Sequence, residues 1–380
     1  MKVVIAPNAF KNSLPADEVA AAIRQGLLQG GYKGDCVCHP VGDGGDGTGA
    51  LLNHCLGAEV IAATVADPLG RSITASFGWI AATKTAVIEL ADASGLRLLD
   101  PKEYDPLRAT TAGCGQLIKA ALDRGAAEIL FCIGGSATVD GGSGLLKELG
   151  VVFLNEKKEP LQQLPADLVS LRGIDRQHSD PRLNATTFTI LCDVKNHLLG
   201  AKGAAAVFGP QKGAGPDEVR LLESGLKQLR RITERVTGTD INQLTYSGAA
   251  GGVAATCMAF FNAKAVNGID YFLSRTGFEA LLKDAGWVIT GEGAIDHQTL
   301  EGKAPYGVAR MAKRYGIPVI GVAGKVPEEE DTALNEYFDW LLPINEQPLP
   351  LEEAIRLTRT NLEKTGRKIA STLNSQLDIP

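Results

Sequence analysis

The sequence has few of the features that mark nucleic-acid-binding, membrane-embedded or P-loop proteins. Of its 380 residues only 6% are aromatic, and the formal net charge of -6 leaves no basic stripe for a nucleic acid. No apolar run reaches the length of a membrane span. A Gly-x4-Gly-Lys-Ser/Thr loop is also missing, because Gly302-Lys303 is followed by Ala304 and Gly324-Lys325 by Val326. We therefore expect no nucleic-acid partner, no membrane partner and no ordinary P-loop chemistry.

Cysteine is scarce and dispersed. The 7 cysteines form no disulfide pattern, and Cys132 and Cys192 fall in apolar strand-like runs, which predicts reduced core thiols. Cys36-Val37-Cys38-His39 has no second Cys pair at zinc-finger spacing, so we expect no zinc site. Because Met1–Pro7 reads as a strand, we expect neither a signal nor a transit peptide, and hence a cytoplasmic protein.

Glycine, in contrast, is abundant. With 44 glycines and 44% hydrophobic residues, the composition suits an α/β enzyme with many tight turns. Strands and helices alternate near both ends of the chain, whereas short apolar runs after Arg71 resemble antiparallel hairpins. We predict a doubly wound α/β domain of Rossmann or flavodoxin type, formed by residues 1–67 and 284–380. An inserted mixed α/β domain of residues 68–283 interrupts it.

The most informative segment is the glycine-rich turn Val41–Thr48, which carries Asp43 and Asp46 and leads into a predicted helix. Glycines let backbone N–H groups approach an anion, and a helix N-terminus favours negative charge. The two carboxylates would repel a phosphate unless Mg²⁺ lay between them. This combination of glycines and carboxylates indicates phosphoryl transfer.

Two further glycine loops follow predicted strands. In the loop Gly134–Gly142, backbone and hydroxyl donors can cradle phosphate while Asp140 binds a metal or a substrate hydroxyl. The loop Thr290–Asp296 also contains glycines next to acidic residues. Lys303 follows it, just before a predicted helix, where its ammonium group can neutralise the charge of a phosphate. We expect both loops to contact phosphate.

Two more candidates lie at ends of predicted strands. Lys11 lies in the loop between the first strand and the first helix, where it can meet an anion. Asp193 closes the predicted strand Thr187–Cys192, and the carboxyl ends of parallel strands face the ligand crevice. Serine-triad chemistry has no support, because no Gly-x-Ser-x-Gly elbow occurs at a strand-to-helix turn.

Alternatives to a small-molecule kinase stay open at this stage. Gly42-x-Gly44-x-x-Gly47 matches the dinucleotide fingerprint of a nicotinamide-dependent dehydrogenase, although Asp43 and Asp46 would then face the pyrophosphate. The run Gly44–Thr48 resembles the signature of the NAD and diacylglycerol kinases. A catalytically silent metabolite sensor is a third alternative.

Taken in order along the chain, the motifs resemble those of the bacterial glycerate kinases of the first type. This chain has Asn8 where the family usually has Asp, Val139 where Asn is frequent, and Gln116 where Glu is frequent. The matching segments are Val4-Ile5-Ala6-Pro7 with Phe10-Lys11 and Ser13-Leu14, Asp43–Thr48, Ile88-Glu89-Leu90 with Ala93–Leu96, Ile133–Thr138 with Asp140–Gly142, Cys192–Val194, Phe208–Ala214, Gly248–Gly252 and Ile289–Gly293.

The resemblance implies ATP-dependent phosphorylation of D-glycerate to a phosphoglycerate, with 2-phosphoglycerate favoured, and Mg²⁺ as cofactor. It also implies two α/β domains with a cleft between them, and a homodimer is a candidate assembly. Lys11 or Lys212 would bind the glycerate carboxylate. The candidate catalytic residues are Lys11, Asp43, Asp46 and Asp193, of which the three aspartates are also the candidate metal ligands. The candidate substrate- and phosphate-binding residues are Asn8, Gly134, Gly135, Ser136, Thr138, Asp140, Lys212, Gly291, Glu292, Gly293, Asp296 and Lys303.

Overall fold

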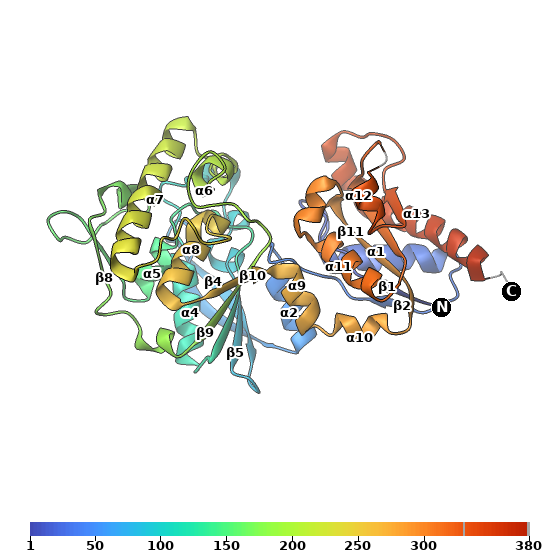
Figure 1. Ribbon diagram of the computed structural model, residues 1–380, viewed down its shortest axis with the longest axis horizontal. Helices are drawn as coiled ribbons and strands as arrows, with labels where there is room; N and C mark the ends of the chain where they lie inside the picture. The colour runs from blue at the N-terminus through green and yellow to red at the C-terminus, as the bar shows by residue number, and fades with distance from the viewer. Residues whose placement is uncertain (330, 378–380) are drawn as a thin grey trace. The chain divides into compact units, whose positions relative to one another are not determined.

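The computed structural model describes residues 1–329 and 331–377 (Figure 1). Its contacts divide the chain into two compact units. Unit 1 comprises Met1–Asp43 and Ile269–Pro380, and unit 2 is the continuous segment Gly44–Gly268. The fold is of mixed α/β type, as predicted, with one parallel and one mixed main sheet.

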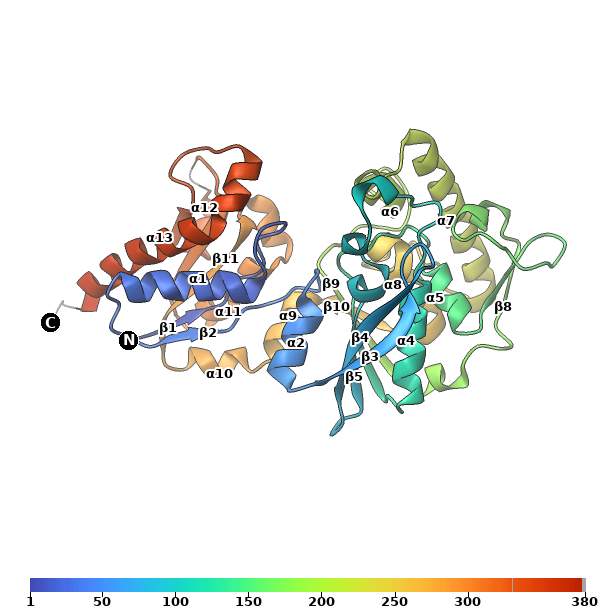
Figure 2. The same cartoon turned by 180° about the vertical axis from the view of Figure 1, so that it is seen from behind.

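The strands of unit 1 form a five-stranded sheet in the order β13-β12-β11-β1-β2, and all its neighbours are parallel. Within this unit, Figures 1 and 2 show α1 and α13 on one face of the sheet and α11 on the other. The elements of unit 1 are β1 (Lys2–Ile5), α1 (Ala16–Gln29), β2 (Cys36–Cys38), α9 (Gly268–Arg275), α10 (Phe278–Leu282), β11 (Ala285–Ala294), the 3-10 helix η7 (His297–Glu301), α11 (Ala304–Arg314), β12 (Val319–Lys325), α12 (Thr332–Asn335), β13 (Trp340–Pro343) and α13 (Leu351–Leu377).

Glycine allows the close approach of α1 and α13. A Cβ on Gly26 would lie 2.2 Å from the Glu363 carbonyl oxygen, and one on Gly366 would lie 2.7 Å from the Ile23 carbonyl oxygen. Ile23 of α1 and Leu362 of α13 are almost fully buried in the same core cluster as Ile5 and Ile289 of the sheet. The predicted apolar strands and helices of unit 1 therefore share one core.

Unit 2 is built on a six-stranded sheet in the order β10-β9-β6-β5-β4-β3, in which the pairs from β10 to β5 are parallel and β4 and β3 are antiparallel. The hairpins predicted after Arg71 are thus confirmed. The elements of unit 2 are α2 (Thr48–Leu56), β3 (Glu59–Ala66), β4 (Ser72–Ile80), β5 (Thr85–Glu89), α3 (Ala91–Ser94), η1 (Leu96–Leu98), η2 (Pro101–Glu103), α4 (Ala112–Asp123), β6 (Glu128–Cys132), α5 (Ser143–Glu148), β7 (Val152–Leu154), η3 (Ala166–Ser170), β8 (Gly173–Asp175), η4 (Pro181–Asn184), β9 (Thr187–Cys192), α6 (Ala204–Phe208), η5 (Pro210–Lys212), α7 (Pro216–Thr237), η6 (Ala249–Gly252), α8 (Val253–Phe261) and β10 (Lys264–Asn267).

The chain passes from one unit to the other at residues 43/44 and 268/269, whereas the sequence predicted boundaries near Asp67 and Asp284. The first difference arises because β3 pairs with β4 from Glu59 to Ala66, which draws β3 and the preceding helix α2 into unit 2. The second arises because α9 packs into unit 1, where a Cβ on Gly307 would lie 2.7 Å from Ile269. Sequence patterns of local elements do not reveal such long-range pairing.

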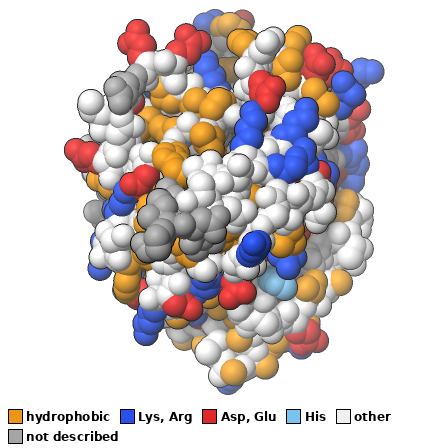
Figure 3. All heavy atoms as spheres, turned by 90° about the vertical axis from the view of Figure 1, so that its right-hand side faces the viewer, with side chains coloured by type: hydrophobic (Ala, Val, Ile, Leu, Met, Phe, Trp, Pro, Cys, Tyr) orange, Lys and Arg blue, Asp and Glu red, His pale blue; other side chains and the backbone are white. Residues whose placement is uncertain are grey.

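The surface carries charges of both signs. On the face that Figure 3 presents, Lys and Arg side chains occur beside Asp and Glu side chains, with hydrophobic side chains between them. Among the described residues, no helix is both long and apolar enough to cross a membrane.

Candidate active site

The first group of candidate residues gathers at one edge of the unit 2 sheet. Strands β5, β6 and β9 are neighbours and run parallel, so their carboxyl ends share this edge. β5 ends at Glu89, β6 leads into the loop Gly134–Gly142, and β9 is followed directly by the exposed Asp193. The loop Gly134–Gly142 and Asp193 therefore lie at the same edge of the sheet as Glu89.

Two glycine loops touch at this edge. The Gly134 N–H donates to the Gly44 carbonyl oxygen at 2.9 Å, and a Cβ on Gly134 would lie 2.4 Å from the Gly45 Cα atom. Gly135 has φ +70, in the left-handed region, and a Cβ there would lie 3.2 Å from the Asp46 Cβ atom. Only glycine permits this approach, which brings Asp46 against the second loop.

Asp46 belongs to a small group of charged side chains within unit 2. Its side chain is 44% exposed and its Oδ1 atom lies 3.2 Å from Arg97 Nη1, which belongs to η1. Arg97 also pairs with Asp92 of α3. The Glu89 carboxyl group, at the end of β5, forms a hydrogen bond with the Asp46 side chain.

Glu89 anchors the start of α2. Its side chain accepts hydrogen bonds from the N–H groups of Gly47 and Gly49. Burial raises the pKa of Glu89 to about 8, and the hydrogen bond to Asp46 adds to the rise. Burial likewise raises the pKa of Asp92, against the lowering effect of Arg97. Three crowded carboxyl groups share one guanidinium at this edge, and this crowding adds to burial in disfavouring their full ionisation.

Asp140 lies inside unit 2. Its side chain is fully buried and accepts hydrogen bonds from the N–H and the hydroxyl of Thr111 and from the N–H groups of Gly142 and Gly144. Burial raises its pKa, while these four donors oppose the rise. Asp140 therefore holds the loop to the starts of α4 and α5, which differs from the metal or hydroxyl contact expected from the sequence.

Lys212 is also enclosed. Its side chain is 3% exposed, and its Nζ atom donates to Ser136 Oγ and to the Thr138 carbonyl oxygen, both at 2.7 Å. Burial lowers the pKa of Lys212 to about 7, and the negative charge of Asp140 opposes this shift. The lysine and the loop Gly134–Thr138 thus come together as one group, which the sequence did not predict as a pair.

The second group of candidate residues lies within unit 1, at the carboxyl ends of β1, β2 and β11. The Asn8 side chain donates to Asp43 Oδ2 at 2.9 Å, and the Asn8 N–H donates to the Gly291 carbonyl oxygen at 2.8 Å. A Cβ on Gly291 would lie 2.0 Å from the Val322 carbonyl oxygen, so β12 leaves room for glycine only. Asn8, Asp43 and Gly291 are therefore brought together.

Glu292 lies beside them, with its Oε1 atom 3.5 Å from Lys303 Nζ and 3.3 Å from Thr299 Oγ1. Burial raises the pKa of Glu292 to about 7, Lys303 lowers it and Asp43 raises it further. Asp296 has a different position, because it caps η7 by accepting a hydrogen bond from the Gln298 N–H. Lys11 is exposed, and a Cβ on Gly293 would lie 3.9 Å from its backbone nitrogen.

The described residues do not form a complete metal site by themselves. No group of three or more His, Cys, Asp and Glu side chains in residues 1–329 and 331–377 is arranged to hold a metal ion. Mg²⁺ needs only one or two protein carboxylates when a substrate phosphate completes its coordination. Asp46 is accessible and lies beside the glycine loop Gly134–Gly142, so it fits that requirement. The carboxyl groups of Glu89 and Asp92 lie close to it, and this crowding favours the binding of a cation.

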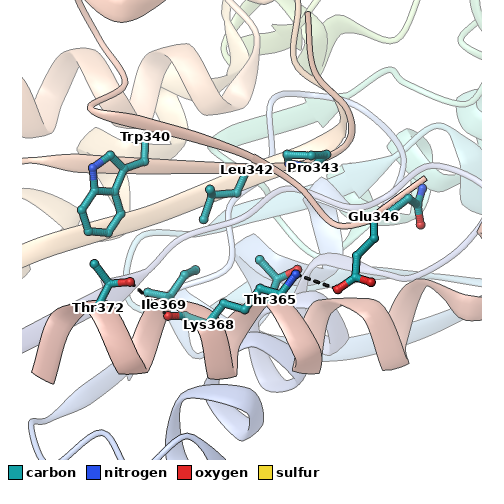
Figure 4. A pocket seen from close by; sticks show the side chains of 9 residues that line it. Trp340, Leu342, Pro343, Glu346, Thr365, Lys368, Ile369 and Thr372 are labelled. Carbon is teal, nitrogen blue, oxygen red and sulfur yellow. Dashed lines mark hydrogen bonds and ion pairs between the residues drawn. The ribbon is translucent and has the colours of Figure 1, made fainter. Parts of the chain in front are cut away.

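Unit 1 also contains a pocket away from these residues. It has a volume of about 600 Å³ and lies between β13 and α13, with Trp340, Leu342 and Ile369 among its lining residues (Figure 4). Figure 4 shows the ion pair between Lys368 and Glu346 on its rim, with an Nζ to Oε1 distance of 2.7 Å. The lining contains none of the candidate catalytic or binding residues.

Sequence reasoning missed several residues of the two groups. Glu89 follows the same rule as Asp193, since it ends a buried parallel strand, so this signal could have found it. Arg97, Thr111 and Thr299 carry no local signal, because their roles depend on partners far along the chain. All seven cysteines are free, as predicted.

Comparisons with known proteins agree on one family. The sequence model described as "Glycerate kinase family" matches residues 3–374. The chain is 40% identical to a Bacillus subtilis protein named "Glycerate kinase" over 373 residues, which cover 98% of each sequence. It is 39% identical to the Escherichia coli protein named "Glycerate 2-kinase" over 374 residues, again 98% of each.

A solved structure leads to the same family. The structure described as a putative glycerate kinase 2 from Salmonella typhimurium LT2 has a TM-score of 0.82 and 39% sequence identity to this chain, and the match covers 100% of both. The comparisons favour neither a lipid or NAD kinase nor a dehydrogenase. Because the family model spans nearly the whole chain and the site loops lie inside it, this chain is a kinase that belongs to the glycerate kinase family.

Proposed function

We propose that the protein transfers the γ-phosphoryl group of ATP to a hydroxyl of D-glycerate, with Mg²⁺ as cofactor. The observation that carries the proposal is the contact between the two glycine loops of unit 2, in which Asp46 lies against Gly135. Backbone N–H and hydroxyl donors suit phosphate oxygens, and an adjacent carboxylate suits Mg²⁺. Relatives named glycerate kinase support glycerate as the acceptor.

The favoured product is 2-phosphoglycerate. The resemblance to the first type of bacterial glycerate kinases supports this choice, as does the printed name of the Escherichia coli relative.

Asp43, Asp46 and Asp193 take the carboxylate roles in this proposal. Asp43 and Asp46 are three residues apart in one loop, so their Cα atoms lie within about 11 Å whatever the arrangement of the two units. One of these aspartates orients the attacking hydroxyl or accepts its proton. Bound Mg²⁺ would neutralise negative charge on the phosphoryl group during its transfer, and Asp46 is the leading candidate for its protein ligand.

The phosphate contacts come from two loops. In unit 2 these are Gly134, Gly135, Ser136 and Thr138, with Asp140 acting from inside by holding the loop. In unit 1, Gly291, Gly293 and Lys303 offer backbone donors and one ammonium, next to Glu292. Of the two lysines considered for the glycerate carboxylate, the exposed Lys11 suits a small soluble anion better than the enclosed Lys212. The side-chain amide of Asn8 takes part in substrate binding. Asp296 contributes indirectly, because it caps η7.

The same proposal assigns unit 1 a doubly wound arrangement, which its parallel strand order and its helices on both faces support. Unit 2 is then the insertion. The cytoplasmic location and the homodimer stay predictions.

The proposal is tested by incubating the purified protein with ATP, D-glycerate and Mg²⁺ and identifying the product by phosphorus NMR. We expect 2-phosphoglycerate to form in step with ADP, and chelation of Mg²⁺ to stop its formation until the metal is restored. Parallel reactions with L-glycerate, NAD and diacylglycerol measure acceptor choice. ADP release that does not depend on D-glycerate, or that requires NAD or diacylglycerol, would contradict the proposed function.

A further inference from the structure

Lys212 is held by its own segment directly beneath the loop Gly134–Thr138. It closes η5 and reaches a loop 76 residues earlier in the chain. The next residue, Gly213, has φ +97, and a Cβ there would lie 2.6 Å from the Tyr104 carbonyl oxygen. A side chain at position 213 would therefore displace the segment, so the position of the Lys212 amine is built into the fold.

The amine lacks a carboxylate partner in the part of the chain that the structure describes. Its recorded contacts are the neutral oxygen atoms of Ser136 and Thr138. The charged group that acts on it is Asp140, whose oxygens are already engaged by Thr111, Gly142 and Gly144. A buried ammonium without an ion pair is unfavourable, so the site favours the arrival of an anion.

The loop above the amine has free donors. Within residues 1–329 and 331–377, no protein acceptor is recorded for the N–H groups of Gly135 and Ser136. Since the Lys212 ammonium donates to Ser136 Oγ, the hydroxyl proton of Ser136 must point elsewhere. Thr138 Oγ1 is buried without a partner as well. The loop thus has unpaired donors next to an amine that can accept a proton.

We propose that Ser136 and Lys212 form an anion-binding pair for a phosphate group of the nucleotide or of the phosphoglycerate product, and that Lys212 takes up one proton when this phosphate binds. The inference rests on the proposed function and deepens it. Ser136 touches the phosphate, while Lys212 acts through Ser136 as a positioning residue. One proton moves from solvent to Nζ, and no covalent bond changes.

The sign of the pH effect follows from this geometry. Burial lowers the pKa of Lys212 to about 7 in the free protein, and the negative charge of a bound phosphate raises it again. Below pH 7 the amine is already charged. Above it, binding must be accompanied by protonation, so the affinity for phosphate falls as the pH rises, by up to about tenfold per pH unit. Asp140 is the charged group that acts on Lys212, and the backbone and Cβ atom of Tyr104 lie beside the adjoining Gly213.

The experiment is calorimetric titration of the full-length protein with ADP and, in a separate arm, with 2-phosphoglycerate. Both arms use pH 7.5 to 9, where the ligand phosphates are ionised. Each titration is run in two buffers of different ionisation enthalpy, and the difference in the measured heat gives the number of protons taken up. We expect uptake approaching one proton near pH 8 for the ligand that occupies the site. The arm that shows the uptake identifies which phosphate binds there.

Three variants complete the test. Lys212→Met should abolish the uptake and the pH dependence of affinity, whereas Lys147→Met, at an exposed lysine of α5, should leave both unchanged. Ser136→Ala should weaken binding of the phosphate ligand about tenfold, because one charge-assisted contact is lost. This variant tests the same site if Lys212→Met does not fold. No proton uptake by the wild-type protein in either arm, or equal uptake by Lys212→Met, overturns the proposal.

The proposed function is judged separately. Phosphorylation of D-glycerate without linked proton uptake would sink the Lys212 proposal alone. Linked uptake on binding ADP by a protein that does not phosphorylate D-glycerate would remove the glycerate kinase activity and keep the anion site.

Discussion

At the scale of single residues, the aspartates of the glycine loops have opposite environments. Asp46 is accessible and pairs with Arg97, whereas Asp140 is fully buried and engaged by four donors. The sequence analysis made Asp46 a candidate catalytic residue and metal ligand and Asp140 a candidate binding residue, because each lies in a glycine-rich loop. Their substitutions should therefore affect different quantities.

We expect Asp46→Asn to lower kcat by two or more orders of magnitude, about 3 kcal/mol or more in activation free energy, and to leave the free energy of unfolding nearly unchanged. The reason is that an accessible carboxylate beside a phosphate loop acts mainly on charge in the transition state. Steady-state kinetics with D-glycerate and urea unfolding measure the two quantities. The matched control is Asp284→Asn, which removes a surface ion pair with Lys2 and should be close to neutral in both. Normal turnover by Asp46→Asn would contradict the role given to this residue.

Asp140→Asn should show the reverse pattern. An amide at this position cannot accept all four hydrogen bonds, and one N–H donor would face another, so we expect destabilisation by roughly 1–3 kcal/mol. Urea unfolding gives the value. Activity should fall only as far as the folded fraction falls, and a large loss of kcat at unchanged stability would instead argue that Asp140 contacts a ligand.

At the scale of elements, the contact between the two loops of unit 2 depends on missing side chains. Gly134→Ala would place a Cβ 2.4 Å from the Gly45 Cα atom, and backbone at that distance cannot give way cheaply. We expect the variant to lose roughly 1–3 kcal/mol of stability and most of its turnover, because Asp46 moves with the loop. Gly173→Ala, whose Cβ would meet Leu154 at an ordinary 3.7 Å, is the control for the same substitution elsewhere. Equal behaviour of the two variants in urea unfolding and kinetics would rule out the loop contact.

A second element-scale prediction concerns the link between β2 and helices α9 and α10. His39, 9% exposed, shares a hydrogen bond of 2.9 Å with Thr276, and its ring packs on Phe278. Burial lowers the pKa of His39 to about 4. Between pH 6.5 and 4 the unfolded chain therefore binds a proton that the folded chain does not, so stability falls as the pH drops through this window, by roughly 3 kcal/mol in total.

Urea unfolding at a series of pH values measures this effect. His39→Phe, which keeps a ring but cannot titrate, should remove most of the pH dependence between 6.5 and 4. His54→Gln, at an exposed histidine of α2, should leave it as in the wild type. If the pH dependence survives in His39→Phe, other groups are responsible for it.

At the scale of the whole molecule, the two units have separate cores and separate fluorophores. Trp79 lies in β4 of unit 2, whereas Trp287 and Trp340 of unit 1 stack with ring centroids 4.8 Å apart. We expect urea unfolding curves from Trp79→Phe and from the double variant Trp287→Phe with Trp340→Phe to have different midpoints, because each reports a different unit. Coincident curves, with circular dichroism showing the same single transition, would mean that the units unfold together.

The sequence predicted local elements well where apolar periodicity was long. The strand predicted over Thr187–Cys192 is β9, and the helix predicted after the turn Val41–Thr48 is α2. Less regular segments were missed: Lys264–Asn267 forms β10, and the helices α9 and α10 follow it. These short elements are specified by their neighbours in the fold, since four to eight residues carry too little pattern to identify them.

The sequence by itself determined the class of this protein. Its glycine loops, their carboxylates and their order along the chain sufficed to indicate phosphoryl transfer and the glycerate kinase family, because such motifs are local and need no partner to be recognised. Only the tertiary structure decided which members of each motif are accessible and which are buried. Pairing of β5, β6 and β9 added Glu89 to Asp46, enclosed Asp140, and set Lys212 beneath Ser136. Burial and long-range contacts set these roles, and they depend on residues too distant in the chain for any local pattern to reveal.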